Sequence, residues 1–258
     1  MKKKSPTAHP IARLEVIDAL RGFAVAMMIA YHCCFDLTYY GWAHWAMLDD
    51  LAWISWRNTI VGTFLFVVGL SLALRDERER GTPAAAYASR GFLIRMGQIA
   101  LAALLVTAGS AVLFPQSFIY FGVLHFVVAA LWIARRAPRL GGGAIAVGVA
   151  LLIVGIVVHT PAFDPKAINW IGFAATKPYT EDYVPLVPWL GVTLIGCGVG
   201  AAWSRRGWRL APGPARAWDA LPSSLRRVLL TAGSWSLTIY LVHQPLLLGA
   251  MGLVKQMG

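Results

Sequence analysis

The sequence predicts an all-α, polytopic transmembrane helical bundle of about seven spans. Hydrophobic residues make up 58% of the 258-residue chain and charged residues only 14%, and the mean hydropathy is +0.61. Water-soluble domains of this length carry far more charge. Apolar runs of roughly 20 residues, enough to cross about 30 Å of hydrocarbon, recur without the strict alternation of a membrane β-barrel strand.

The predicted spans follow one another along nearly the whole chain, and the fourth is short. They are expected at 17–38, 51–74, 92–113, 118–134, 143–160, 185–204 and 228–251. No repeat and no separate soluble domain is visible, so residues 1–258 are expected to form a single integral-membrane domain. Three prolines interrupt 205–227, which favours a loop before the last span.

The basic residues predict the orientation of these spans, because Lys and Arg are retained on the cytoplasmic side. Only four of the 23 fall on the other side: Arg57, Lys166, Lys177 and Lys255. The N-terminus is therefore expected in the cytoplasm and the C-terminus outside. The net charge of +11 then reflects topology and attraction to the lipid bilayer, and nucleic-acid binding is not expected.

A stripe of polar residues runs along the first predicted helix. Arg21 and His32 are eleven positions apart, about three turns and roughly 16 Å, and share one face. Asp18 lies one turn before Arg21, and Asp36 lies one turn after His32. Charged groups are costly in lipid, so this face is expected to line a site or pathway inside the bundle.

Two further histidines fall within predicted spans. His125 lies in the fourth, and His243 lies near the outer end of the seventh, where it shares a helix face with Tyr240. A histidine can take up and return a proton near neutral pH, and a neighbouring carboxylate fixes its tautomer. Together with His32, these residues predict a shared polar cavity. The three cysteines are expected to serve packing, and no metal site is expected.

Five segments resemble one family in order along the chain: RLEVIDALRGFAVAMMIAYHCCFDLTYYG, LFVVGLSLAL, FGVLHF, VPLVPWLGVTLIGCGVG and SWSLTIYLVHQP. They are similar to small bacterial members of the heparan-α-glucosaminide N-acetyltransferase catalytic-domain family, part of the transmembrane acyltransferase superfamily. Arg21, ten residues and then His32 also resemble the first-helix signature of acyltransferase family 3. The resemblance implies a multi-pass protein of the bacterial inner membrane that transfers acyl groups, typically acetyl from cytoplasmic acetyl-CoA, to a saccharide or glycolipid amine or hydroxyl outside.

The resemblance also assigns roles to residues. His32 is expected to be the general base or a transient acyl carrier, with Asp36 orienting it. His44 is the second choice, because the lysosomal branch carries its catalytic histidine at about that position. The phosphates of acyl-CoA are expected at cations on cytoplasmic helix ends, and the acceptor among polar and aromatic groups. The donor set is Arg21, Asp18, Arg90 and Arg95, and the acceptor set is His125, Trp189, Tyr240, His243 and Gln244.

Other functions remain open from the residues alone. A transporter or proton-coupled permease could use the same intramembrane His, Asp and Arg groups as a relay, although the chain has no repeated halves. A membrane cytochrome could ligate haem through histidines of different helices. The chain could also form a homo-oligomer. The acceptor, the acyl length and the choice between an acyl-histidine and direct transfer are not predicted.

Overall fold

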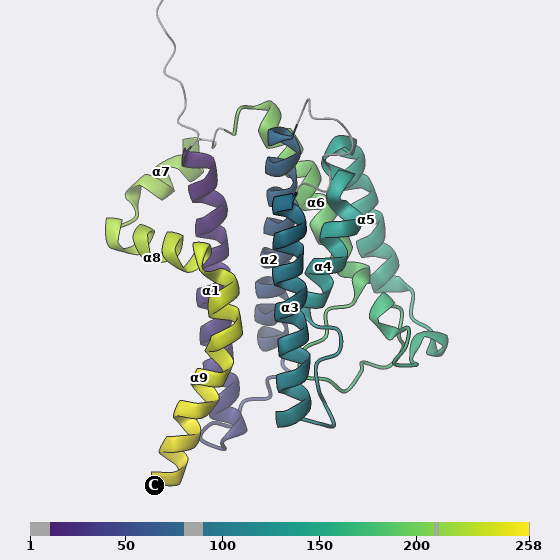
Figure 1. Ribbon diagram of the computed structural model, residues 1–258, viewed down its shortest axis with the longest axis vertical. Helices are drawn as coiled ribbons and strands as arrows, with labels where there is room; N and C mark the ends of the chain where they lie inside the picture. Colours follow the sequence, from purple (N-terminus) through teal and green to yellow (C-terminus); the bar gives the residue numbers. More distant parts are fainter. Residues whose placement is uncertain (1–10, 80–89, 209, 211, 258) are drawn as a thin grey trace, which may run out of the picture. The chain divides into compact units, whose positions relative to one another are not determined.

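The computed structural model describes residues 11–79, 90–208, 210 and 212–257, and the regular structure in them is helical (Figure 1). The all-α prediction is therefore confirmed. Lys2, Lys3, Lys4, Arg80 and Arg209, which contribute to the predicted orientation, lie outside the described residues. The α-helices are α1 (Ile11–Tyr39), α2 (Leu51–Arg78), α3 (Arg90–Leu113), α4 (Val123–Ile133), α5 (Gly142–Val157), α6 (Leu186–Arg205), α7 (Pro212–Ala220), α8 (Ser223–Ser234) and α9 (Ser236–Met257).

Within the described part of the chain, five helices are long and apolar enough to cross a membrane: α1 from Glu15, α2, α3, α6 and α9. The protein is thus a multi-pass membrane protein. The fourth and fifth predicted spans correspond to shorter helices. Helix α4 has 11 residues, because Phe121 before it forms a bridge with Tyr183, and because a 3-10 helix containing Pro138 follows from Ala134 to Leu140.

The region before the last span differs from the prediction. The apolar run expected at 228–251 is divided, because α8 ends at Ser234 and α9 begins at Ser236. Arg226, Arg227 and Thr231 give α8 a polar face, so this helix is amphipathic and unlike a membrane span. The loop expected at 205–227 contains α7 and the first turn of α8, since proline is well accommodated in the first turn of a helix.

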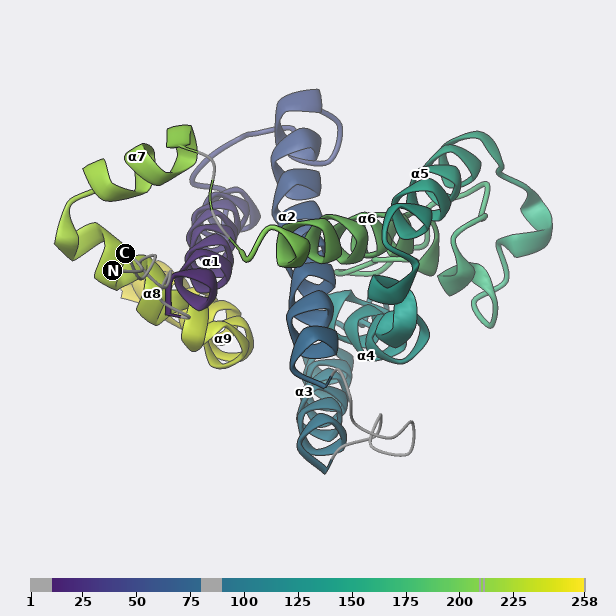
Figure 2. The same ribbon diagram turned by 90° about the horizontal axis from the view of Figure 1, so that it is seen from above.

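The chain forms two compact units by its contacts, residues 1–63 with 205–258 and residues 64–204. In the first unit, α8 and α9 pack on α1 although they come from the other end of the sequence (Figures 1 and 2). Helix α9 runs parallel to α1: Gly233, just before it, meets Asp18 near the start of α1, and further along the Tyr40 hydroxyl donates to the Leu248 carbonyl at 2.9 Å.

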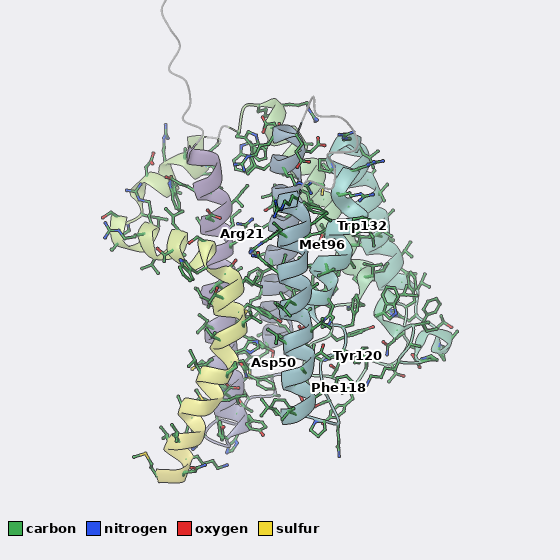
Figure 3. The ribbon with its side chains drawn as sticks, in the orientation of Figure 1. Arg21, Asp50, Met96, Phe118, Tyr120 and Trp132 are labelled. Atoms are coloured by element: carbon green, nitrogen blue, oxygen red, sulfur yellow. The ribbon has the colours of Figure 1, made fainter. Side chains whose placement is uncertain are left out.

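The second unit is built around α6, which has the most buried residues of its described helices. Glycines bring helix backbones together there: Gly69 of α2 and Gly148 of α5 both lie against α6. The C-terminal end of α2 meets the 3-10 helix that follows α4, since Arg139 of that 3-10 helix pairs with Asp76 of α2 at 3.0 Å. Figure 3 shows Trp132 in the upper half of this unit and Tyr120 in its lower half.

Candidate functional site

The first unit joins four polar residues from the two ends of the chain. Helix α1 carries His32 and Asp36 one turn apart, and α9 carries His243 and Gln244 next to each other. Because α1 and α9 run side by side, the pair on α1 meets the pair on α9 between the two helices. Asp36 is 0% exposed and His243 is 8% exposed. These four residues, the polar cluster, combine predicted catalytic residues with predicted acceptor-binding residues.

A hydrogen-bond chain connects Asp36 to His32 through Gln244. The Gln244 amide nitrogen donates to Oδ1 of Asp36 at 2.8 Å. The Gln244 amide oxygen lies 2.6 Å from Nδ1 of His32. The expectation that Asp36 orients His32 as a direct neighbour is therefore replaced by an indirect arrangement, because the side chain of Gln244 occupies the space between them. Gln244, which was expected to bind the acceptor, forms hydrogen bonds with both His32 and Asp36.

His243 packs its ring edge-on against His32, with ring centroids 4.9 Å apart. Its Nδ1 lies 2.8 Å from the carbonyl oxygen of Tyr240 and 3.2 Å from that of Ile239. Carbonyl oxygens only accept hydrogen bonds, so Nδ1 carries the proton and Nε2 presents a lone pair. Among the described residues, this buried Nε2 has no hydrogen-bond partner, and neither has Oδ2 of Asp36.

Such unpaired atoms are costly, because a buried donor or acceptor without a partner loses about 1–3 kcal/mol. Two of them within one cluster point to a place where a hydrogen-bond donor from outside the protein chain belongs. Nε2 of His32 likewise has no hydrogen bond from the described residues. The cluster therefore offers two imidazole lone pairs and a carboxylate oxygen to an incoming group.

Aromatic rings surround the histidine side of the cluster. Tyr31 lies edge-on to His32 at 5.9 Å between ring centroids. Trp53 and Trp56 of α2 then pack against Tyr31 at 6.1 and 5.7 Å. Both tryptophans belong to the part of α2 that lies in the first unit. Tyr31, which is itself buried, therefore places an aromatic ring packed on two others beside His32.

The predicted donor-binding pair lies on the same helix as the cluster. Arg21 donates to Asp18 at 2.8 Å, and both side chains are about 30% exposed. Figure 3 shows Arg21 on α1 beside the crossing with α8. Helix α1 is continuous from Arg21 to His32, so the expected separation of roughly 16 Å along one face applies.

The second-choice histidine, His44, lies in the connection between α1 and α2 and is exposed. Among the described residues, no hydrogen bond, ion pair or ring contact joins His44 to the polar cluster. Its side chain is also without the hydrogen bonds that fix the rings of His32 and His243. His44 therefore lacks the supporting hydrogen bond that Gln244 gives His32.

The remaining predicted site residues belong to the second unit. Both ring nitrogens of His125 form hydrogen bonds with its neighbours. The Gly122 N–H donates to Nδ1 at 3.3 Å, and Nε2 lies 3.1 Å from the Thr107 hydroxyl. That hydroxyl donates to the Ile119 carbonyl, so it accepts from His125. Both ring nitrogens are satisfied, which is the arrangement of a structural histidine. Trp189 is half-buried on α6, and Arg90 and Arg95 are exposed on α3.

The connection before α6 is a folded segment. Tyr183 donates its hydroxyl to the Asn169 carbonyl at 2.7 Å, and Tyr120 donates to the Asn169 side chain at 3.0 Å. Burial, with a smaller contribution from Tyr120, raises the pKa of Tyr183 to about 12. Burial also raises the pKa of Tyr120. These hydroxyls stay protonated at neutral pH and act as structural donors.

Comparison with known proteins agrees with the resemblance found in the sequence. The family model described as "Heparan-alpha-glucosaminide N-acetyltransferase, catalytic" matches residues 13–245. The matched range begins before Asp18 and ends one residue after Gln244, so it includes both halves of the polar cluster. Neither the curated proteins nor the solved structures that were searched gave a match. The family match covers most of the chain, and the protein therefore belongs to the heparan-α-glucosaminide N-acetyltransferase catalytic family, a family of membrane acetyltransferases.

Proposed function

We propose that this membrane protein is an acyl-CoA-dependent acyltransferase. It moves an acetyl or other acyl group from cytoplasmic acyl-CoA to an amine or hydroxyl of a saccharide or glycolipid on the outer side. The whole chain, residues 1–258, acts as one acyltransferase domain in the bacterial inner membrane. The observation that carries this proposal is the hydrogen-bonded series Asp36, Gln244 and His32, which leaves Nε2 of His32 without a partner among the described residues.

The chemical step needs a group that takes a proton and returns it. In the proposal, Nε2 of His32 accepts the proton of the acceptor's amine or hydroxyl as that atom attacks the thioester carbonyl carbon. The new C–N or C–O bond forms, the C–S bond breaks, and the leaving thiolate of coenzyme A takes the proton from His32. General acid–base catalysis of this kind contributes about 10²–10⁴-fold to a rate.

The donor is proposed to lie along α1. Its phosphates meet Arg21, since guanidinium groups match phosphate oxygens in charge and geometry. Its thioester reaches His32, because the roughly 16 Å rise between the two residues is of the same order as an extended pantetheine arm. The path along α1 from Arg21 to His32 is proposed as a tunnel that opens on the cytoplasmic side. Arg90 and Arg95, both exposed in the second unit, stay predictions for donor binding.

The acceptor is proposed to meet His243, whose buried Nε2 requires a hydrogen-bond donor. Tyr240 shares the helix face of His243, and their ring centroids lie 5.8 Å apart. A hydroxyl or amine hydrogen suits this atom, whereas a carboxylate or phosphate oxygen has no hydrogen to offer. His125 has no free nitrogen in the described residues, so its proposed part is to shape the second unit. Trp189 belongs to the second unit and stays a prediction for acceptor binding.

The test is acyl transfer by the purified protein in detergent or in vesicles, with labelled acetyl-CoA and a panel of amino sugars and neutral sugars. Release of free coenzyme A and label in the acceptor are measured together. His32→Asn keeps a polar side chain but cannot shuttle a proton at neutral pH, so we expect loss of transfer with expression and monodispersity unchanged. His159→Asn, at an exposed histidine, is the matched control and is expected to stay active.

Two outcomes would overturn this assignment. Full activity in His32→Asn together with loss in His44→Ala would place the chemistry in the connection between α1 and α2. Solute uptake into vesicles without consumption of acyl-CoA would identify a transporter or permease, the main alternative that the same polar residues allow.

A further inference from the structure

Gln244 is the one member of the polar cluster that has no charge and no transferable proton at neutral pH. Its amide must point its nitrogen at Asp36, because an ionised carboxylate only accepts hydrogen bonds. Its oxygen then faces His32 at 2.6 Å. The reverse orientation would set two oxygens against each other at Asp36. The direction of the whole series is therefore determined by the carboxylate at its buried end.

This direction fixes the tautomer of His32. The amide oxygen of Gln244 is an acceptor, so Nδ1 of His32 has to be the protonated nitrogen. The lone pair is left on Nε2. If the amide were absent, Nδ1 and Nε2 would compete for the single proton of the neutral ring, and part of the population would have no lone pair at Nε2.

Gln244 also separates His32 from the charge of Asp36. In a hydrolytic triad the carboxylate touches the histidine directly and stabilises the imidazolium. Here the nearest acceptor of His32 is a neutral amide, and the carboxylate lies one hydrogen bond further away. The arrangement orients the ring as a carboxylate would while giving the charged form of the ring less support.

We propose that Gln244 is a positioning residue that holds His32 in the Nδ1–H tautomer and keeps it neutral, so that Nε2 stays available as a base. This inference rests on the proposed acyltransferase function for its consequence in catalysis, but the tautomer itself is a property of the protein alone. We assign Gln244 a positioning role in place of a substrate-binding role, because its side chain forms two hydrogen bonds inside the protein.

Other titratable groups face His32 from the elements packed against it. Asp36 and Tyr31 lie on α1 and His243 lies on α9. From α2, Arg57 acts electrostatically on Tyr31. Helix α8 meets α1 at Gly22, nearly three turns away from His32. Any pH effect of changing Gln244 is therefore compared with that of Gln256→Glu, a control that leaves all of these groups in place.

The sharpest test exchanges the amide and the carboxylate. Asp36→Asn with Gln244→Glu keeps the net charge and the number of hydrogen-bonding groups, but brings the carboxylate into contact with Nδ1 of His32. An opposite charge at that distance favours the protonated ring by about 1–3 pH units. We expect the acidic limb of the kcat/KM profile, and the midpoint of His32 protonation in nitrogen NMR, to move upward together by that amount.

Gln244→Ala removes the tether without adding charge. We expect nitrogen NMR to show a mixture of His32 tautomers, and kcat to fall by about 10² with KM little changed. Gln256→Glu, at an exposed glutamine of the same helix, is the matched control and should leave both the tautomer and the pH profile unchanged.

The two proposals fail in different ways. A protein that transfers no acyl group contradicts the acyltransferase proposal, yet its NMR spectrum still reports the tautomer of His32. A wild-type spectrum with the proton on Nε2 of His32, or an unchanged midpoint in the exchange variant, would overturn the role of Gln244 even if transfer is observed.

Discussion

A β-carbon built on Gly22 of α1 would lie 1.9 Å from the carbonyl oxygen of Leu229 on α8. The contact is reciprocal, since a β-carbon on Gly233 of α8 would lie 1.8 Å from the carbonyl oxygen of Asp18. The two helices thus cross backbone to backbone, with a glycine from each. This crossing fixes the part of α1 that carries Arg21, one residue before Gly22.

We expect Gly22→Ala and Gly233→Ala to destabilise the protein, because each added methyl group would overlap a backbone carbonyl that cannot move aside. Overpacking of this kind costs about 1–3 kcal/mol. Thermal unfolding in detergent measures the effect. Gly249→Ala is the control, because nothing lies within 4 Å of the added carbon; it should be neutral or slightly stabilising, since alanine favours helix. Equal stability of all three variants would contradict the crossing.

His243→Phe tests Nε2 of His243, which has no hydrogen-bond partner in the described parts of the chain. Phenylalanine keeps a ring against His32 but offers no lone pair, so packing survives while the acceptor's contact is lost. We expect kcat/KM to fall by roughly 10–100-fold, with a thermal midpoint close to wild type, because one hydrogen bond at the reacting group is worth about 1.5–3 kcal/mol when charge develops. Wild-type transfer by His243→Phe would limit this histidine to packing.

Arg21 is expected to contribute to binding of the donor. Acetyl-CoA at about 100 times its dissociation constant should stabilise the solubilised protein by about 2.7 kcal/mol. Arg21→Ala should reduce that shift in the thermal midpoint, because a phosphate contact is removed. Asp18→Asn breaks the same ion pair but keeps the guanidinium, and should preserve the shift. If both variants lose the acetyl-CoA-induced shift equally, the Arg21–Asp18 ion pair contributes to structure and not to donor binding.

The orientation of the spans can be tested with reporter fusions. Fusions after Leu140 and Asp219 should report the cytoplasm, and fusions after Lys166 and Met257 should report the outside. The connections at the first two fusion points hold nine Lys and Arg residues, whereas Lys166, Lys177 and Lys255 are the three near the last two fusion points. The ion pair of Arg139 with Asp76 places the basic ends of their two helices on one face of the second unit. A cytoplasmic C-terminus would require a different number of crossings.

The raised pKa of Tyr183 predicts that the protein loses stability at alkaline pH. Its pKa is about 12 in the folded protein, above the value of roughly 10 for an exposed tyrosine. The folded state therefore holds this proton more tightly, and stability falls as the pH rises from about 10 towards 12. Tyr183→Phe should flatten that decline in thermal unfolding, relative to the control Tyr179→Phe at an exposed position. If stability declines with pH equally in the two variants, Tyr183 is not the cause of the alkaline loss of stability.

The fold class was predictable because apolar length is a local property of the sequence. The runs that became α1, α2, α3 and α6 each have the required length and composition. The boundary at Trp235 was not predictable in the same way. Leu229 and Leu230 are as apolar as a span requires, and what separates α8 from α9 is the tertiary contact of Gly233 with α1.

The site was predictable in part for the same reason. Helical spacing alone places His32 one turn from Asp36, and it predicts the Arg21 and Asp18 pair, which the structure contains. The position of Gln244 between His32 and Asp36 depends on how α9 packs against α1, which no spacing within one helix reveals. His125 was predicted to share a polar cavity with His32 and His243, and the sequence did not reveal that Thr107 and Gly122 supply its hydrogen-bond partners in space.

The parallel packing of α1 and α9 has a consequence for biogenesis. His32 and Gln244 are 212 residues apart in sequence, so the ribosome has to add all of the intervening residues before the second half of the polar cluster exists. A truncated or stalled chain would carry Asp36 and His32 in the bilayer without the amide that pairs them. Assembly of the cluster therefore requires that the last helix enters the membrane in the correct direction, and an unfinished chain would expose an unpaired carboxylate for membrane quality control to detect.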